Sequence, residues 1–306
     1  MLPYIVRRLA AAVPVVWGVS TFVFLMIHLV PGDPVQLMYG NLPMSQADLD
    51  RIRAQLGLDQ PLLVQYGQFF VKLLQADLGR SIRSQQPVVN EILLRLPYSV
   101  LLATLSTAAA LVLGILAGVI AATRRGRWLD TLTTAVSVLG VSIPSFWLGL
   151  MLIFLFAVRL GWLPASGSGT PQHLVLPVLS LALLSSAIIA RLTRSGMLDV
   201  LNMEYVTTAR AKGLAERAIL YRHALKNALI PVITIVGLQF GTLLGGAFVV
   251  ETVFAWPGVG RLAVQALSTR DYPIIQGVVL FVSLIVLLVN LATDVLYVVI
   301  DPRVRA

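Results

Sequence analysis

Long uninterrupted apolar stretches are the feature of this sequence that most restricts its fold. Six of them run for about 20 residues with almost no charge, and a helix of that length crosses roughly 30 Å of hydrocarbon. The six stretches are Leu9–Val30, Ser99–Thr123, Thr133–Arg159, Leu174–Ala190, Ile230–Val250 and Ile274–Ile300. Backbone polar groups inside a bilayer must be satisfied within each segment. We therefore predict an all-α integral membrane protein with six transmembrane helices.

Composition agrees with a membrane protein. The 306 residues are 58% hydrophobic and only 12% charged, whereas soluble domains average about 25% charged residues. The chain contains no cysteine, which excludes disulfides, thiolate metal sites and cysteine nucleophiles. A net charge of +9 can indicate nucleic-acid binding, but most cations here lie at the ends of apolar stretches, where they orient a protein in a bilayer. We expect no nucleic-acid partner.

The distribution of Lys and Arg predicts the orientation. If the N-terminus is cytoplasmic, the cytoplasmic segments hold Arg7, Arg8, Arg124, Arg125, Arg127, Arg191, Arg194, Arg210, Lys212, Arg217, Arg222, Lys226, Arg303 and Arg305. The short loops on the other side hold only Arg159, Arg261 and Arg270. Because cytoplasmic loops are enriched in Lys and Arg, we predict that both termini and the polar segment 191–228 face the cytoplasm.

A second polar segment, residues 31–98, follows the first apolar stretch. Ser45 is placed to cap a helix that has Asp48 in its first turn and ends at Gly57, and Pro61 opens another helix with an apolar face. That face comprises Leu62, Leu63, Tyr66, Phe69, Phe70, Leu73 and Leu74. We predict a small helical extracytoplasmic cap, which is also compatible with docking of a soluble partner. Residues 1–98 thus hold the first transmembrane helix and this cap, and residues 99–306 hold a five-helix core.

Signatures of catalysis are absent from the sequence. There is no G-x-x-x-x-G-K-[ST] phosphate-binding loop, and His28, His173 and His223 lack the paired spacing of a catalytic zinc site. Ser142 and Ser145 have no histidine or lysine beside them that would activate a hydroxyl. We predict no catalytic residue, metal site or cofactor site, and the sequence argues against an intramembrane hydrolase.

Few ionisable residues interrupt the apolar stretches, and Asp294 in the last one is the main example. An acid within the membrane is a candidate for function, but Asp294 lies within about two turns of the predicted cytoplasmic end, which favours snorkelling or a helix-to-helix bond. Glycines in the stretches are typical of close helix packing, and a pore-lining role for some of them is the alternative. The candidates for a pathway or gate are Gly245, Gly246, Glu251 and Asp294.

The basic, helix-prone segment 204–231, EYVTTARAKGLAERAILYRHALKNALIP, indicates how energy reaches the chain. A transporter with neither an ion relay nor a nucleotide site has to receive force from another protein. We predict that Gly213 divides the segment into two helices, with Arg210 and Lys212 in the last turn of the first, and that Pro231 opens the next span. A solvated linker attracted to anionic lipid is the alternative. We favour a coupling helix seated in a cytoplasmic motor protein, whose closure tilts the attached helices.

Motifs along the whole chain resemble those of permease subunits of ABC importers, most closely the branch that imports peptides and, in some members, nickel. TARAKG (Thr208–Gly213) followed by RHALKNALIPV (Arg222–Val232) is similar to their EAA loop, although the usual first Glu is replaced. The other matching motifs are, in order, HLVPGDP (His28–Pro34), QLGLDQPL (Gln55–Leu62), DLGRS (Asp77–Ser81), ETVFAWPGVGR (Glu251–Arg261), RDYP (Arg270–Pro273) and DPRVR (Asp301–Arg305). Their order and spacing carry the resemblance.

The resemblance implies a type I ABC importer permease in the bacterial inner membrane. This non-catalytic subunit would form half of a pathway for short peptides, with dipeptides or glutathione slightly favoured by the GWLP loop, residues 161–164. Its partners would be a second permease subunit, two cytoplasmic ATPase subunits that bind ATP and Mg, and an extracytoplasmic binding protein. Nickel, haem or another metal complex is the alternative cargo, and an ATP-independent secondary transporter is the less favoured alternative. ETVFAWPGVGR would form a re-entrant or surface loop near the outer mouth. The residues assigned to the ATPase-coupling loop are Glu204, Ala209, Arg210, Lys212, Gly213, Arg222 and His223.

Overall fold

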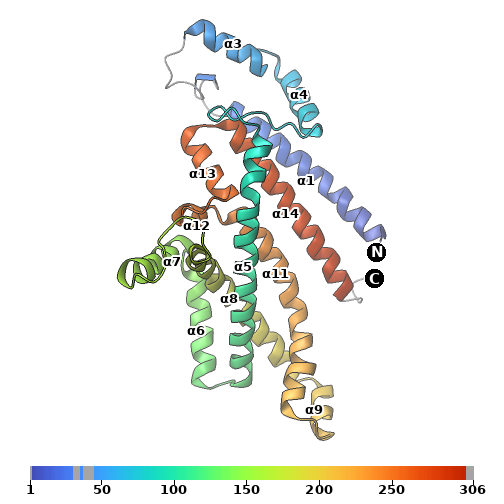
Figure 1. Ribbon diagram of the computed structural model, residues 1–306. Coiled ribbons are helices and arrows are strands. Elements are labelled where there is room, and N and C mark those ends of the chain that lie inside the picture. Colours follow the sequence, from blue (N-terminus) through green and yellow to red (C-terminus); the bar gives the residue numbers. More distant parts are fainter. Residues whose placement is uncertain (1, 30–34, 37–44, 301–306) are drawn as a thin grey trace.

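The computed structural model describes residues 2–29, 35–36 and 45–300, and in this part of the chain the fold is built from helices (Figure 1). Five helical stretches are long and apolar enough to cross a membrane, and a bent pair supplies a sixth. The long helices are α1 (Leu2–Leu29), α5 (Val88–Thr123), α8 (Gln172–Leu201), α11 (Lys226–Gly246) and α14 (Tyr272–Ile300). The predicted helical membrane fold is confirmed.

The third predicted span, Thr133–Arg159, is not one straight helix. It consists of α6 (Trp128–Ser142) and α7 (Ser145–Leu152), which continues into the π-helical turn η1 (Ile153–Arg159), and the two arms meet at 108°. Pro144 lies at the break, and both Ile143 and Pro144 have extended backbone torsions. A proline removes one helical N–H and disfavours the helical conformation in the residue before it, so the chain turns here.

The pair α5 and α8 forms the centre of the bundle, and small residues bring the two helices together. A Cβ on Gly114 would lie 2.6 Å from the Cβ of Ile189, and a Cβ on Gly118 would lie 2.6 Å from the carbonyl oxygen of Ala190. Real side chains do not approach so closely, so only glycine allows this packing distance. The predicted packing role of glycines is confirmed at these two positions.

The helix after the coupling segment starts earlier than predicted. A short helix, α10 (Glu216–Ala218), runs through the π-helical turn η2 (Ile219–Leu225) into α11, so that residues 216–245 form one apolar helical stretch. Pro231 lies inside α11 and does not open the span, which corrects the prediction. A proline inside a helix removes one backbone hydrogen bond, and here the helix continues past that position.

The polar segment before α5 forms a cap beyond one end of the bundle (Figure 1). Its helices are α3 (Gln46–Leu56) and α4 (Leu62–Leu74). Ser45 caps α3, Gly57 ends it in the left-handed region with φ of 70°, and Pro61 precedes α4, all as predicted. The predicted apolar face of α4 does not pack as a unit, because Leu63 and Leu74 are 84% and 88% exposed. By helix geometry Leu63 and Leu74 lie at one edge of this face, away from Phe69, which contacts α1.

Aromatic side chains attach α4 to the end of α1. Phe24 of α1 contacts Tyr66 and Phe69, with ring centroids 5.2 and 5.6 Å apart. The hydroxyls of Thr21 and Tyr66 are 2.8 Å apart and share a hydrogen bond. Pairs of aromatic rings in such tilted arrangements each contribute roughly 0.5–1.5 kcal/mol beyond their buried area. The cap is therefore fixed against the bundle.

Candidate functional site

The predicted coupling segment forms a helical hairpin at the end of the molecule opposite α3 and α4 (Figure 1). After α8, the helix α9 (Glu204–Ala211) ends where Gly213 takes a left-handed φ of 76°, and α10 follows. The Gly213 N–H donates to the carbonyl of Arg210 at 2.9 Å. A Cβ on Gly213 would meet no atom within 4 Å. The predicted division at Gly213 is confirmed, and the glycine lies in open space.

One face of α9 is anchored in a buried cluster. Val206, Ile219 and Ala224 are fully buried, and they pack with Met197 of α8 and Ala228 of α11. Ala209 also packs against this cluster, which places it on the inner face of α9. Burial of a valine side chain contributes about 1.5–3 kcal/mol. The buried cluster therefore joins α9 to α8 and α11.

The other face of the segment is exposed and carries both cations and large apolar side chains. Arg210 pairs with Glu216 at 2.8 Å, and both side chains are exposed, so the pair contributes little to stability. Glu204, Lys212 and Arg222 are exposed, and His223 is half-buried in η2. The exposed apolar side chains are Met203, Tyr205, Leu214 and Tyr221. An apolar surface mixed with cations is typical of a protein-binding surface.

A bidentate ion pair ties α8 to the first turn of α6. Nε of Arg194 is 2.5 Å from Oδ1 of Asp130, and Nη2 is 2.9 Å from Oδ2. The Gly126 N–H donates to the same Oδ2 at 3.0 Å. Sequence reasoning used Arg194 only as an orientation signal, because the two partners are 64 residues apart and no local pattern joins them. Forked arginine–carboxylate pairs are both strong and directional.

Glu251, a predicted pathway or gate residue, is a buried helix cap. It lies in α12 (Phe248–Val253), outside the membrane-spanning helices, and is only 1% exposed. Ser99 of α5 donates to its Oε1 at 2.6 Å, and the Arg261 N–H donates to Oε2 at 2.9 Å. The Val259 N–H donates to Ser99 Oγ at 2.9 Å. Burial raises the pKa of Glu251, and its hydrogen bonds oppose that rise. The carboxyl thus satisfies the start of α13 (Val259–Thr269).

Glycines of the ETVFAWPGVGR motif make room for this carboxyl. A Cβ on Gly258 would lie 2.2 Å from Oε1 of Glu251, and one on Gly260 would lie 2.6 Å from the Cα of Phe248. The indole N–H of Trp256 donates to the carbonyl of Tyr98 at 3.0 Å. The motif therefore folds back against α5 as a compact turn, in keeping with the predicted re-entrant or surface loop.

Asp271 joins two motifs that are far apart in the sequence. Ser81 of DLGRS donates to Oδ2 of Asp271, in RDYP, at 2.6 Å, and the Ile82 N–H lies 3.3 Å from Oδ1. Asp271 is 4% exposed. The contact holds the segment between α4 and α5 against the start of α14. Both motifs can be recognised in the sequence, but no sequence pattern indicates that they contact each other.

The remaining pathway candidates take part in helix packing. Asp294 of α14 forms an ion pair with Arg8 of α1 at 2.7 Å. A Cβ on Gly245 would lie 3.2 Å from Val282 of α14, and Gly246 is the last residue of α11. A role of these residues in a pathway or gate stays a prediction. The PGDP and DPRVR motifs lie outside the described residues.

No cluster of three or more His, Cys, Asp or Glu side chains suited to a metal ion occurs among the residues that the structure describes. The contacts described above are an anchored helical hairpin at one end of the molecule and two buried carboxyl groups, those of Glu251 and Asp271, towards the other.

Comparison with protein families shows which proteins share this arrangement. Residues 114–306 match the family described as binding-protein-dependent transport system inner membrane component. Residues 1–103 match the N-terminal region of the corresponding membrane components. The chain belongs to this family. As such a component, it is a multi-pass inner membrane permease subunit and a transport protein rather than an enzyme.

Individual relatives match this chain over its whole length. The glutathione transport system permease protein GsiC of Escherichia coli strain K12 is 46% identical over 305 residues, which span 100% of this chain and 99% of the relative. The protein of the same name from Shigella dysenteriae serotype 1 gives the same identity and coverage.

Solved structures support the fold. A chain of the MetNI methionine ABC transporter in an inward-facing conformation has a TM-score of 0.57 at 21% identity, over 68% of this chain and 95% of that chain. A chain of an amino acid ABC transporter with histidines has a TM-score of 0.52 at 17% identity, over 70% and 94% of the two chains. The permease has the fold of type I ABC importer permeases, as predicted.

Proposed function

We propose that this chain is one of two permease subunits of an ATP-driven, binding-protein-dependent importer, and that α9 receives the force of cytoplasmic ATPase subunits. The observation that carries the proposal is the two-sided character of α9. Its inner face is locked to α8 and α11 through the fully buried Val206. Its outer face presents the exposed Tyr205, and the turn that follows α9 presents Lys212 and Leu214, which are also exposed. The sequence itself contains no nucleotide-binding loop.

The contacts define how force would travel. A push on α9 moves α8, whose Arg194 holds Asp130 at the start of α6. The same push moves α11 through the continuous helix from residue 216 to residue 245. At the other end of α11, Glu251 links α12 and α13 to Ser99 of α5. Rigid helices joined at both ends by buried contacts act as levers, so the hairpin and the outer loop move together.

The proposed cargo is glutathione or another short peptide. The support is the 46% identity over the full chain to proteins named glutathione transport system permease. The proposed partners are a second permease subunit, two ATPase subunits that bind ATP and Mg, and an extracytoplasmic binding protein. In this arrangement both termini and α9 face the cytoplasm, and α3 and α4 face outward.

Reconstitution with these partners in proteoliposomes tests the proposal through Gly213→Trp. The wild-type assembly is expected to hydrolyse ATP faster with loaded binding protein and to take up glutathione or a labelled dipeptide. The variant is expected to keep the assembly and its hydrolysis but to lose about ten-fold or more of the uptake, because the new side chain changes how the turn after α9 contacts the bound ATPase while the buried cluster that anchors α9 stays intact.

Gly161→Trp is the matched control. Gly161 also has a positive φ, 64°, with no atom within 4 Å of a Cβ, but it lies in the loop between η1 and α8. The control variant bears the same left-handed strain and is expected to retain coupled uptake. Wild-type uptake by Gly213→Trp would contradict the role of α9, and absence of any stimulated hydrolysis by the wild-type assembly would contradict the importer itself.

A further inference from the structure

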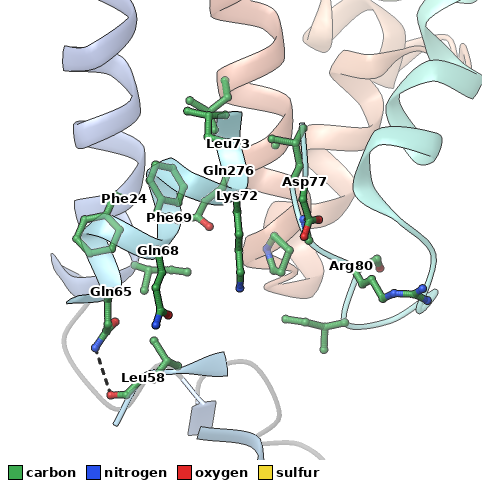
Figure 2. Close-up of a pocket in the computed structure, with 18 of the residues that line it drawn as sticks. Phe24, Leu58, Gln65, Gln68, Phe69, Lys72, Leu73, Asp77, Arg80 and Gln276 are labelled. Carbon is green, nitrogen blue, oxygen red and sulfur yellow. Dashed lines mark hydrogen bonds between the residues drawn. The ribbon is translucent and has the colours of Figure 1, made fainter. Parts of the chain in front are cut away.

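A cavity of about 480 Å³ opens where the cap meets the bundle, and neither the coupling contacts nor the buried carboxyls account for it. Its walls come from the end of α1, from α4, from the segment containing DLGRS and from the start of α14 (Figure 2). The volume falls within the roughly 300–1,000 Å³ of typical ligand pockets. Both the polar residues and the apolar residues of its lining restrict what can bind there.

The cavity lies at the level where two membrane spans end. His28 lines it from the last turn of the α1 span, which ends at Leu29, and Pro273 lines it from the first turn of the α14 span, which begins at Tyr272. The lining continues along α14 to Leu280. Seven residues of helix cover about 10 Å. The cavity therefore reaches from the head-group level into the hydrocarbon.

Its rim carries an unpaired cation beside a carboxylate. Lys72 is exposed, and among the described residues it has no hydrogen-bond or ion-pair partner. Figure 2 shows its side chain extended across the opening between Gln68 and Asp77. Oδ1 of Asp77 accepts from the Gly79 N–H at 2.9 Å, which leaves Oδ2 as an unused acceptor within the described residues. The rim thus offers the Lys72 ammonium as a donor and Oδ2 of Asp77 as an acceptor. The Arg80 guanidinium, which donates to the Gln85 carbonyl at 3.1 Å, also lines the cavity.

The apolar wall is held in place by hydrogen bonds between the elements. Nε2 of His28 lies 3.0 Å from Oε1 of Gln65, which joins α1 to α4. Nε2 of Gln276 donates to the carbonyl of Val23 at 2.9 Å, which joins α14 to α1. The rings of Phe24 and Phe69 meet at a tilted angle of 48° in the same region (Figure 2). A site whose walls are already fixed loses little entropy when it binds a ligand.

We propose that this cavity binds a phospholipid whose head group carries an N–H or O–H donor, with phosphatidylethanolamine as the reference ligand. The phosphate contacts Lys72, the head-group donor contacts Oδ2 of Asp77, and an acyl chain runs along Leu73 and Leu280. A basic side chain near the membrane surface attracts the negatively charged phosphate of a lipid head group.

A membrane lipid fits this cavity better than a soluble ligand because of its place in the bundle. Of the long helices, α1 packs chiefly against α14, and most of its residues outside that contact are exposed. The apolar end of the cavity thus adjoins a membrane-spanning helix whose surface is open in this chain, so that an acyl chain could reach it from the bilayer. The bound lipid would fasten the cap to the membrane surface.

Native mass spectrometry of the transport assembly, released from nanodiscs that contain phosphatidylethanolamine, tests the site. The wild type is expected to retain one tightly bound phosphatidylethanolamine per copy of this chain. Lys72→Met lowers its retention about ten-fold, because a charged hydrogen bond to the phosphate is lost. Arg83→Met, which removes an exposed cation on the same segment outside the lining, leaves retention unchanged.

Two further arms separate the possible ligands. Phosphatidylcholine has no head-group donor for Asp77 and is expected to bind more weakly than phosphatidylethanolamine, whereas soluble glycerophosphoethanolamine lacks acyl chains and does not compete. A photoreactive phosphatidylethanolamine is expected to label residues 58–82 or 273–280. Equal retention by Lys72→Met and the wild type, competition by the soluble head group, or labelling confined to the second permease subunit would overturn the proposal. None of these readouts measures transport, so failure of the lipid site and failure of the proposed function can be told apart.

Discussion

Glu251 shows how one residue can connect three elements. Its carboxyl accepts hydrogen bonds from Ser99 and from the Arg261 N–H, and its own helix, α12, precedes the loop that these contacts close. A carboxylate at a helix N-terminus satisfies N–H groups that have no partner within the helix. Removal from water nevertheless disfavours its charged form, and this effect raises its pKa.

The raised pKa of Glu251 predicts a pH-dependent stability. A carboxyl whose pKa is higher in the folded than in the unfolded protein stabilises the fold most below the unfolded value, about 4.5 here, and this contribution is lost as the pH rises through the folded value. The apparent melting temperature of the wild type is expected to fall over that range, and Glu251→Gln is expected to lack this part of the fall. Differential scanning fluorimetry at several pH values measures both.

Glu216→Gln is the control, because Glu216 is exposed and pairs only at the surface with Arg210. It is expected to keep the pH profile of the wild type. Identical profiles for Glu251→Gln and the wild type would show that the carboxyl of Glu251 does not titrate between the folded and unfolded states as described.

Sequence reasoning found the local contacts of single residues and missed the distant ones. The Ser45 cap, the Gly57 terminus and the division at Gly213 follow from backbone preferences of a few adjacent residues, and all three are present. The bonds of Glu251 to Ser99 and of Asp271 to Ser81 join residues 152 and 190 positions apart. No pattern within a single sequence specifies such pairs.

The close contact between α5 and α8 predicts that a larger residue at Gly118 destabilises the protein. Gly118→Ala would place a methyl group 2.6 Å from the carbonyl oxygen of Ala190, and neither backbone can give way without separating the helices. Overpacking of this kind costs about 1–3 kcal/mol. The variant is expected to show a lower apparent melting temperature and reduced assembly with its partners, as measured by thermal shift and size-exclusion chromatography.

Gly18→Ala in α1 is the matched control within a membrane span, since a Cβ there meets nothing within 4 Å. Its apparent melting temperature is expected to stay close to that of the wild type, because the added methyl group makes no new contact. Equal behaviour of the two variants would contradict the close approach of α5 and α8.

Helices with a long apolar pattern could be predicted from the sequence, whereas local breaks and bends in the helices could not. The apolar stretches located all the long helices, because composition over about 20 residues decides whether a helix can enter a bilayer. The 108° bend between α6 and α7 and the π-helical turns η1 and η2 each involve only a few residues, and no such long pattern marks them. Pro144 breaks its helix whereas Pro231 does not, so proline alone does not locate a bend.

The whole molecule places its two polar regions at opposite ends (Figure 1). The cap of α3 and α4 lies at one end, and the α9 hairpin lies at the other, with continuous helices between them. This separation suits a protein that meets one soluble partner on each side of a membrane. The proposed mechanism depends on α9 facing the cytoplasm.

A single cysteine at Leu214 tests that claim most directly. The chain has no native cysteine, and Leu214 is exposed beside Gly213 on the outer face of the hairpin. Leu214→Cys is treated with a membrane-impermeant maleimide in inside-out and right-side-out vesicles, with and without co-expressed ATPase subunits. The account predicts labelling only in inside-out vesicles, and strong protection when the ATPase subunits are bound. Labelling in right-side-out vesicles, or equal labelling with and without the ATPase subunits, would contradict it.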